Sequence, residues 1–332
     1  MRGRCGSAPR SSDLVPRYDG PIIDAHQHFW RPGNGRIPWL RPEARINFRY
    51  GDYASIKRDY LPPDLLADAH GLKIVGTVWM ETEWDRSDPV GEIVDLLRTR
   101  EQFGLPDAAV AHAVLRDPAV DETLAALVET SSLVKAIRNK PGQAPGPEQA
   151  HTRPTLMTDL QWQQGYSRLQ EHGLGFELQT AWWHLDEALT LARTFPEIPI
   201  MINHAALPAD RSAEGIAGWS AALRRIATAE QVSIKVSGIG LPGRPWSVVD
   251  HRIIVDTIAE IFGPQRMLFA SNFPVDSLVG SYRDIYDGFL AITADWSAQE
   301  QQAAFLGNAI RCYHLDPAIA DRTGPDPRWS RR

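Results

Sequence analysis

Eight short apolar segments, each followed by a helical pattern, constrain the fold of this chain more than any other feature. Alternating strand-like and helix-like segments predict parallel strands that are joined by helices. Eight such units within 332 residues match the count of a (β/α)8 TIM barrel, an α/β fold that forms a single domain. The predicted strands cover residues 21–27, 73–81, 109–115, 133–138, 175–180, 198–204, 232–237 and 266–271.

A doubly wound sheet is the alternative fold, and its usual marker is a glycine-rich turn after an early strand. One such pattern, GIGLPG at 238–243, follows the seventh predicted strand, and Pro242 precedes its last glycine. No helical pattern begins there, so the context of a dinucleotide-binding turn is missing. We therefore predict a barrel over residues 21–316, with a disordered arm at 1–20 and a loose tail at 317–332.

Composition and charge limit the class of partner. The net charge is −6 and the isoelectric point about 5.9, which does not indicate a nucleic-acid surface. No apolar run approaches the roughly 18 residues of a membrane span. Cys5 and Cys312 lie far apart and outside any CxxC pair, as is usual in a reducing compartment. We expect a cytoplasmic protein with a small-molecule substrate and no membrane or nucleic-acid partner, and leave a homodimer open.

Polar side chains stand at the ends of most of the predicted strands, where such barrels place their active sites. His26 and His28 are two residues apart on the first strand, so their side chains are expected to point to the same face. Buried charge is costly unless it is paired or used, so the set indicates a functional rim, whereas lone His112 is predicted to pack in the core. The other rim candidates are Glu81, Arg138, Gln179, His204, Lys235 and Asn272.

Aromatic residues are expected near this rim. Trp39 lies in a long aromatic loop at 29–60, and Trp183 follows the fifth predicted strand. Both are candidates to stack on a substrate ring, although Trp39 could equally cap the barrel. Serine chemistry is disfavoured because the chain has no GxSxG elbow.

Six segments carry a resemblance to a known family: IIDAHQHFW (22–30), PWL (38–40), RDYLPPDL (58–65), VKAIRNK (134–140), INHAALP (202–208) and SNFPVD (271–276). They resemble the amidohydrolase-2 family of the amidohydrolase superfamily, in particular its sugar lactonases (of the L-fuconolactone and L-rhamnonolactone type) and pyrone-dicarboxylate lactonases. The resemblance covers residues 20–315 and implies a barrel hydrolase that opens a lactone by attack of water on the carbonyl.

Within this resemblance we assign roles to the rim residues. His26, His28 and Arg138 are predicted to stabilise the developing oxyanion, with His204 nearby. The general base stays open among Glu81, Glu83, Asp276 and His204. The predicted catalytic set is His26, His28, Glu81, Arg138, His204 and Asn272, and the predicted substrate contacts are Lys235, Gln179, Trp39, Trp183 and Asp276.

The chain departs from the resembling family where a metal ligand or base is expected. Asn272 stands in place of a strand-eight aspartate, and the fifth strand ends without a histidine. His26, His28 and His204 are the candidate ligands of a divalent metal such as zinc, but we predict that no cofactor is strictly required. A metal-dependent decarboxylase, an amide hydrolase and a catalytically lapsed binding protein are the alternatives, and Asn272 favours the last of these.

Overall fold

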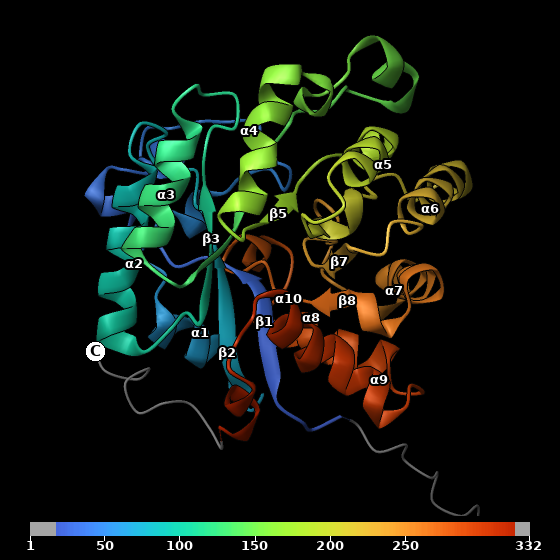
Figure 1. Ribbon diagram of the computed structural model, residues 1–332. Coiled ribbons are helices and arrows are strands. Elements are labelled where there is room, and N and C mark those ends of the chain that lie inside the picture. The colour runs from blue at the N-terminus through green and yellow to red at the C-terminus, as the bar shows by residue number, and fades with distance from the viewer. Residues whose placement is uncertain (1–17, 323–332) are drawn as a thin grey trace, which may run out of the picture.

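The computed structural model describes residues 18–322 and shows a barrel of parallel strands surrounded by helices (Figure 1). Each strand pairs in parallel with the next along the chain, so the predicted fold is confirmed. The strands are β1 (Ile22–Gln27), β2 (Ile74–Met80), β3 (Ala108–His112), β4 (Val134–Arg138), β5 (Gly175–Leu178), β6 (Ile200–Ile202), β7 (Val232–Val236) and β8 (Met267–Phe269).

The helices lie between successive strands or follow β8. Side-chain caps fix several helix starts: the Ser212 side chain accepts from the Gly215 amide, and Ser281 forms a capping box with Asp284. The helices are α1 (Pro62–Asp68), α2 (Pro89–Phe103), α3 (Val120–Thr130), α4 (Leu160–Glu171), α5 (Leu185–Thr194), α6 (Ala213–Ile226), α7 (Val248–Phe262), α8 (Tyr282–Ile292), α9 (Ala298–Gln302) and α10 (Asn308–Cys312).

The barrel closes through hydrogen bonds between β1 and the segment that follows β8. The backbone N–H of Asn272 donates to the His26 carbonyl at 2.8 Å, and the backbone N–H of His28 donates to the Phe273 carbonyl at 2.8 Å. Deeper in the barrel, the fully buried Asp24 accepts from the Ser271 amide at 2.9 Å and from the Ser271 hydroxyl at 2.5 Å. The closure therefore places the end of β1 directly beside Asn272.

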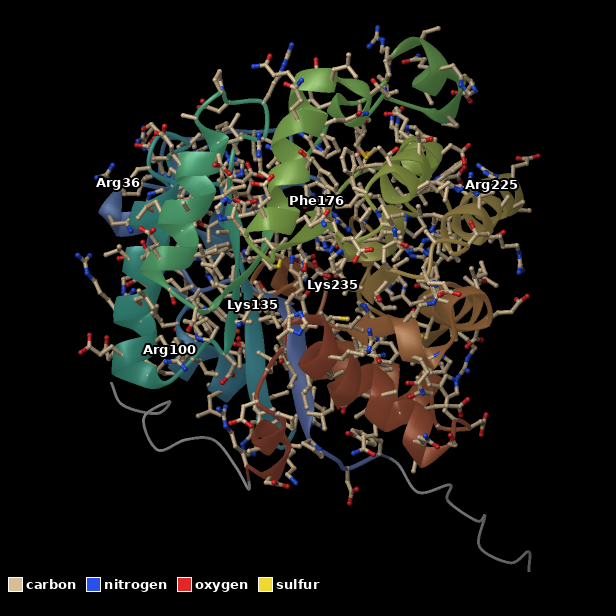
Figure 2. All side chains as sticks on the ribbon, viewed as in Figure 1. Arg36, Arg100, Lys135, Phe176, Arg225 and Lys235 are labelled. Carbon is tan, nitrogen blue, oxygen red and sulfur yellow. The ribbon has the colours of Figure 1, made fainter. Side chains whose placement is uncertain are left out.

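A buried ion pair occupies the interior of the barrel. Lys235 Nζ lies 2.9 Å from Glu177 Oε1, and both side chains are fully buried. Tyr313, which follows α10, donates its hydroxyl hydrogen to the same Glu177 oxygen. Figure 2 shows Lys235 near the centre of the molecule, whereas Arg36 and Arg225 lie at its periphery. Lys235 therefore contacts a carboxylate of the protein, and the prediction that it contacts substrate does not fit this placement.

The end of the described chain packs against the barrel. Residues 317–322 were expected to be loose, but Pro317–Asp321 forms a 3-10 helix and Ile319 is buried among residues of the barrel interior. At the other end, the Tyr18 ring stacks on Phe305 at 5.3 Å, although residues 18–20 were assigned to the arm. The rest of the predicted arm and tail, residues 1–17 and 323–332, lies outside the described residues. From residue 18 to residue 322, no helix has the length and apolar character needed to cross a membrane.

Replacing Asp24 by Ala is expected to lower the free energy of unfolding by about 3 kcal/mol or more, because several buried donors lose their acceptor. Chemical denaturation of both proteins measures the change. Glu260→Ala is the control: Glu260 pairs with Arg224 on the surface, and its loss is expected to cost less than about 1 kcal/mol. Equal losses in the two variants would show that Asp24 does not secure the barrel.

Candidate active site

A pocket of about 120 Å³ opens at the C-terminal ends of the strands. Most of the predicted catalytic residues reach it, together with side chains that were not predicted. The predicted residues that line it are His28, Trp39, Glu81, Arg138, Gln179, His204 and Asn272. Glu83, one of the candidate bases, also lines it, and the polar residues that were not predicted are Arg49, Thr82 and Lys140.

Three histidines cluster at the base of the pocket. The ring of His26 lies 4.6 Å from that of His204 and 5.5 Å from that of His28, centroid to centroid. His26 is fully buried and does not line the pocket, so it does not contact a substrate directly. Burial lowers the pKa of all three imidazoles, that of His28 to about 3. The three rings are therefore uncharged at neutral pH.

The tautomer of His28 follows from its hydrogen bond. His28 Nδ1 lies 3.0 Å from the Met80 carbonyl oxygen, which can only accept, so Nδ1 carries the proton. The other nitrogen, Nε2, then has a lone pair and no hydrogen. The predicted role of His28 as a donor to an oxyanion does not fit the neutral ring, which offers an acceptor instead.

Arg138 is held in place by Glu81. Its Nε lies 2.7 Å from Glu81 Oε1, its Nη2 donates to the Glu81 carbonyl at 2.8 Å, and its Nη1 donates to Gln179 Oε1 at 3.2 Å. Burial acts to raise the pKa of Glu81, but the guanidinium groups of Arg138 and Arg86 outweigh it and hold that pKa well below its usual range. Glu81 is thus a poor base, and its contacts orient Arg138.

Three segments at the rim adopt left-handed backbone conformations. Glu83 has φ 58°, Asn272 has φ 55°, and the residues from His204 to Leu207 all have φ between 51° and 58°. Such conformations are uncommon outside glycine and store strain. Next to them, Gly238 has no Cβ, and one placed there would lie 2.5 Å from His204 Nδ1. The chain therefore uses unfavourable backbone geometry to aim these side chains.

Asn272 and Asp276 form a pair behind the pocket wall. Asn272 Nδ2 donates to Asp276 Oδ1 at 2.6 Å, and the Tyr50 hydroxyl donates to the same oxygen at 3.2 Å. Since a carboxylate accepts these bonds, the amide oxygen of Asn272 is left free for another donor. Burial raises the pKa of Asp276 to about 6. Asp276 does not line the pocket, so the prediction that it contacts substrate does not fit its placement.

Sequence reasoning missed two cations of this pocket. Arg49 reaches it from the loop at 29–60, where its Nη2 donates to the Tyr50 hydroxyl at 2.7 Å. Lys140 follows β4 and contacts Glu83 through its Nζ. The only signal for Arg49 was its place between two aromatic residues, Phe48 and Tyr50, in a loop that was expected at the rim. In that loop Trp39 also lines the pocket and donates to the Thr82 carbonyl at 2.8 Å, so it both borders the pocket and covers the barrel.

The residues present do not fit a tightly held metal ion. Between Tyr18 and Arg322, no three histidine, cysteine, aspartate or glutamate side chains are placed to hold one. Two features suit a metal: His26 has two buried ring nitrogens without a partner among the described residues, and the rings of His28 and His204 lie close to it. Zinc requires three or four ligands, and the nearby carboxylates of Glu81 and Asp276 are already engaged.

Comparisons with known proteins agree with this architecture. The model of the amidohydrolase family matches residues 23–315. The uncharacterized protein y4mH of Sinorhizobium fredii is 32% identical over 90% of this chain and 99% of its own. The L-fucono-1,5-lactonase of Burkholderia multivorans is 27% identical over 90% of this chain and 98% of its own. The crystal structure of an amidohydrolase from Burkholderia multivorans with bound zinc is 25% identical, with a TM-score of 0.73 over 90% of this chain and 100% of that one.

The uncharged histidines predict a pH-dependent stability. Below the unfolded-state pKa of about 6.5, the unfolded chain binds protons that His28 does not bind until near pH 3, so the free energy of unfolding falls as the pH is lowered. His28→Asn is expected to reduce this slope by up to about 1.4 kcal/mol per pH unit between pH 6 and 4. Urea denaturation at several pH values measures it. Ile137→Val weakens the core without removing a titrating group, so it is expected to keep the pH slope of the natural protein. If His28→Asn also kept that slope, the low pKa assigned to His28 would be contradicted.

The Asn272–Asp276 pair predicts how metal affinity can be increased. Asn272→Asp alone places two carboxylates together and raises the pKa of one of them. Exchanging the pair, Asn272→Asp with Asp276→Asn, moves one carboxylate to the pocket wall and keeps the hydrogen bond. We expect this double variant to bind Zn²⁺ about tenfold more tightly or better, because a carboxylate contributes charge where an amide contributes a dipole. Zinc content after dialysis measures it, with Asp276→Asn as the control. Equal zinc in all three proteins would refute the prediction.

Proposed function

We propose that this chain, which belongs to the amidohydrolase family, hydrolyses a lactone by attack of water on the ring carbonyl. The observation that carries the proposal is that an unprotonated His28 nitrogen and the Arg138 guanidinium belong to the same pocket, where the contacts of Glu81 hold Arg138 in place. A lone pair and a fixed cation around one small pocket are what water attack on an ester needs. The relative named L-fucono-1,5-lactonase supports a cyclic ester as the substrate.

Arg138 stabilises the oxyanion that forms when water attacks the carbonyl. Its side chain is only 4% exposed, and in such a site a fixed cation acts through a low dielectric and needs no reorientation during the reaction. Lys140 lines the same pocket, but it pairs with Glu83, so the two together add no net charge. Gln179 accepts from Arg138 through Oε1, so its amide nitrogen remains available as a further donor.

Asn272 and His28 act on the water. The free amide oxygen of Asn272 accepts one hydrogen of the water, and His28 Nε2 accepts the other as the oxygen bonds to the acyl carbon. Burial and then the charge of Arg138 lower the pKa of His28. Negative charge that builds on the carbonyl oxygen offsets the effect of Arg138, so His28 becomes a stronger base as the reaction proceeds.

Collapse of the tetrahedral intermediate opens the ring. The bond between the acyl carbon and the ring oxygen breaks, and the proton on His28 Nε2 passes to the departing ring oxygen. The product is one hydroxy acid, since the leaving group stays attached to the acyl part. An ester needs less help than an amide to expel its leaving group, so a base as weak as His28 is better suited to a lactone than to an amide.

The proposal predicts which side chains control turnover. A panel of aldonolactones and aromatic lactones, followed by proton release, identifies a substrate for the natural protein. On that substrate, Arg138→Lys and His28→Asn are each expected to lower kcat/KM by about 10² or more, because each removes a group that acts in the transition state.

The control for this experiment is Arg224→Gln, because Arg224 pairs with Glu260 on the surface and is expected to leave kcat/KM unchanged. Circular dichroism confirms that each variant is folded. Hydrolysis that persists in both pocket variants would refute the assigned roles, and absence of lactone turnover across the panel in the natural protein would refute the function.

A further inference from the structure

A second compartment of about 270 Å³ adjoins the pocket. The two share Arg49 and Gln179 as lining residues, so the second compartment borders the pocket at these two side chains. Beyond them, Trp183, Leu207, Arg211 and Ile239 line the second compartment. Trp183 was predicted to contact substrate at the pocket itself, but the structure places it here.

The lining of the second compartment is positively charged. Arg49 and Arg211 line it, and none of its lining residues is acidic. Arg49 donates hydrogen bonds to the Tyr50 hydroxyl and the Gly238 carbonyl, and the carboxylate whose pKa its charge lowers, Asp276, is not among the lining residues. The compartment can therefore accept an anion without displacing an ion pair.

Arg211 is only partly satisfied by the protein. Its Nη2 donates to the Ile239 carbonyl at 2.8 Å, but its Nε and Nη1 are buried and have no hydrogen-bond partner among the described residues. Burial lowers the pKa of Arg211 to about 10, and the charge of Asp250 opposes this shift; Asp250 itself pairs with Arg244 at 2.9 Å. Arg211 thus remains charged at neutral pH, and buried donors without a partner are rare in folded proteins.

Apart from Gln143 and Gln179, the remaining side chains of the walls are apolar. The Trp183 indole N–H donates to the Ala144 carbonyl at 3.2 Å, which fixes the ring, and Leu207 and Ile239 add aliphatic surface. A ligand for this space therefore combines an apolar or aromatic body with a negatively charged end, since guanidinium groups recognise carboxylates in preference to neutral groups.

We propose that the second compartment binds a carboxylate at the end of an apolar or aromatic arm of the substrate, while the lactone ring occupies the pocket beside Arg138. This inference rests on the proposed function and names the class of substrate: a lactone that carries a remote carboxylate. Arg49 and Arg211 then determine specificity, and they do so apart from the groups that act on the reacting carbonyl.

The test measures binding without turnover, using benzoate and the matched neutral probe benzamide. Calorimetric titration is expected to show benzoate binding at least about tenfold more tightly than benzamide, a difference of about 1.4 kcal/mol. The indole N–H resonance of Trp183, assigned by its loss in Trp183→Phe, is expected to shift on addition of benzoate. Arg211→Gln and Arg49→Gln are each expected to raise the Kd of benzoate about tenfold or more.

Arg45→Gln is the matched control, because Arg45 belongs to the same loop as Arg49 but contacts only backbone carbonyls of its own loop; its benzoate affinity is expected to be unchanged. If Arg211→Gln does not fold, the exposed Arg49 decides the test. Equal affinity for benzoate and benzamide, or benzoate binding that survives in both arginine variants, would overturn the proposal. Since no hydrolysis is measured, failure here leaves lactone hydrolysis intact, and a failed lactone screen does not alter this result.

Discussion

The contact between Asp24 and Ser271 is the constraint on which the site depends. β1 and β8 lie at opposite ends of the barrel sequence, and Asp24 joins them through the Ser271 amide and hydroxyl, with the Tyr282 hydroxyl as a third donor. One residue beyond Ser271, the backbone N–H of Asn272 donates a hydrogen bond to the His26 carbonyl. The closure that completes the fold therefore also brings the Asn272 side chain beside the histidines. A barrel that opened at this seam would separate the two halves of the site.

Buried ion pairs in the barrel fix the positions of side chains more than they stabilise the fold. The buried pairs Arg138–Glu81 and Lys235–Glu177 gain little net free energy, because desolvation offsets their attraction. Their value is that each cation has one position. The imidazoles remain uncharged among these cations, since burial and nearby positive charge both lower their pKa. Arg49 and Arg211, in contrast, face the second compartment without a carboxylate among its lining residues, which is why that side of the site is open to an anionic group.

The strands were predictable because parallel strands buried on both faces produce continuous apolar runs, and the rim residues because barrels place chemistry at strand ends. What depended on tertiary contacts was not predictable. Lys235 lies on β7 like a rim residue, but only the structure shows that it meets Glu177. Ile319 is buried because it meets the barrel interior, although the composition around it resembles a loose tail. Arg49 reaches the pocket only because its loop folds back across the rim, a path that no local pattern encodes.

The choice of base was also beyond the sequence, because it depends on hydrogen-bond direction and burial. The side-chain N–H of Asn272 donates to Asp276, so the side-chain oxygen of Asn272 points away from that carboxylate. This oxygen accepts a hydrogen bond but cannot take a proton at neutral pH. The carboxylate with the best-matched pKa, Asp276, is thereby kept behind the pocket wall. In the proposed mechanism the proton passes to His28, a weak base whose strength increases as negative charge forms near Arg138. Such a site suits a carbonyl whose leaving group departs readily. Because Asn272 cannot act as a base, its presence is consistent with a lactone as the proposed substrate.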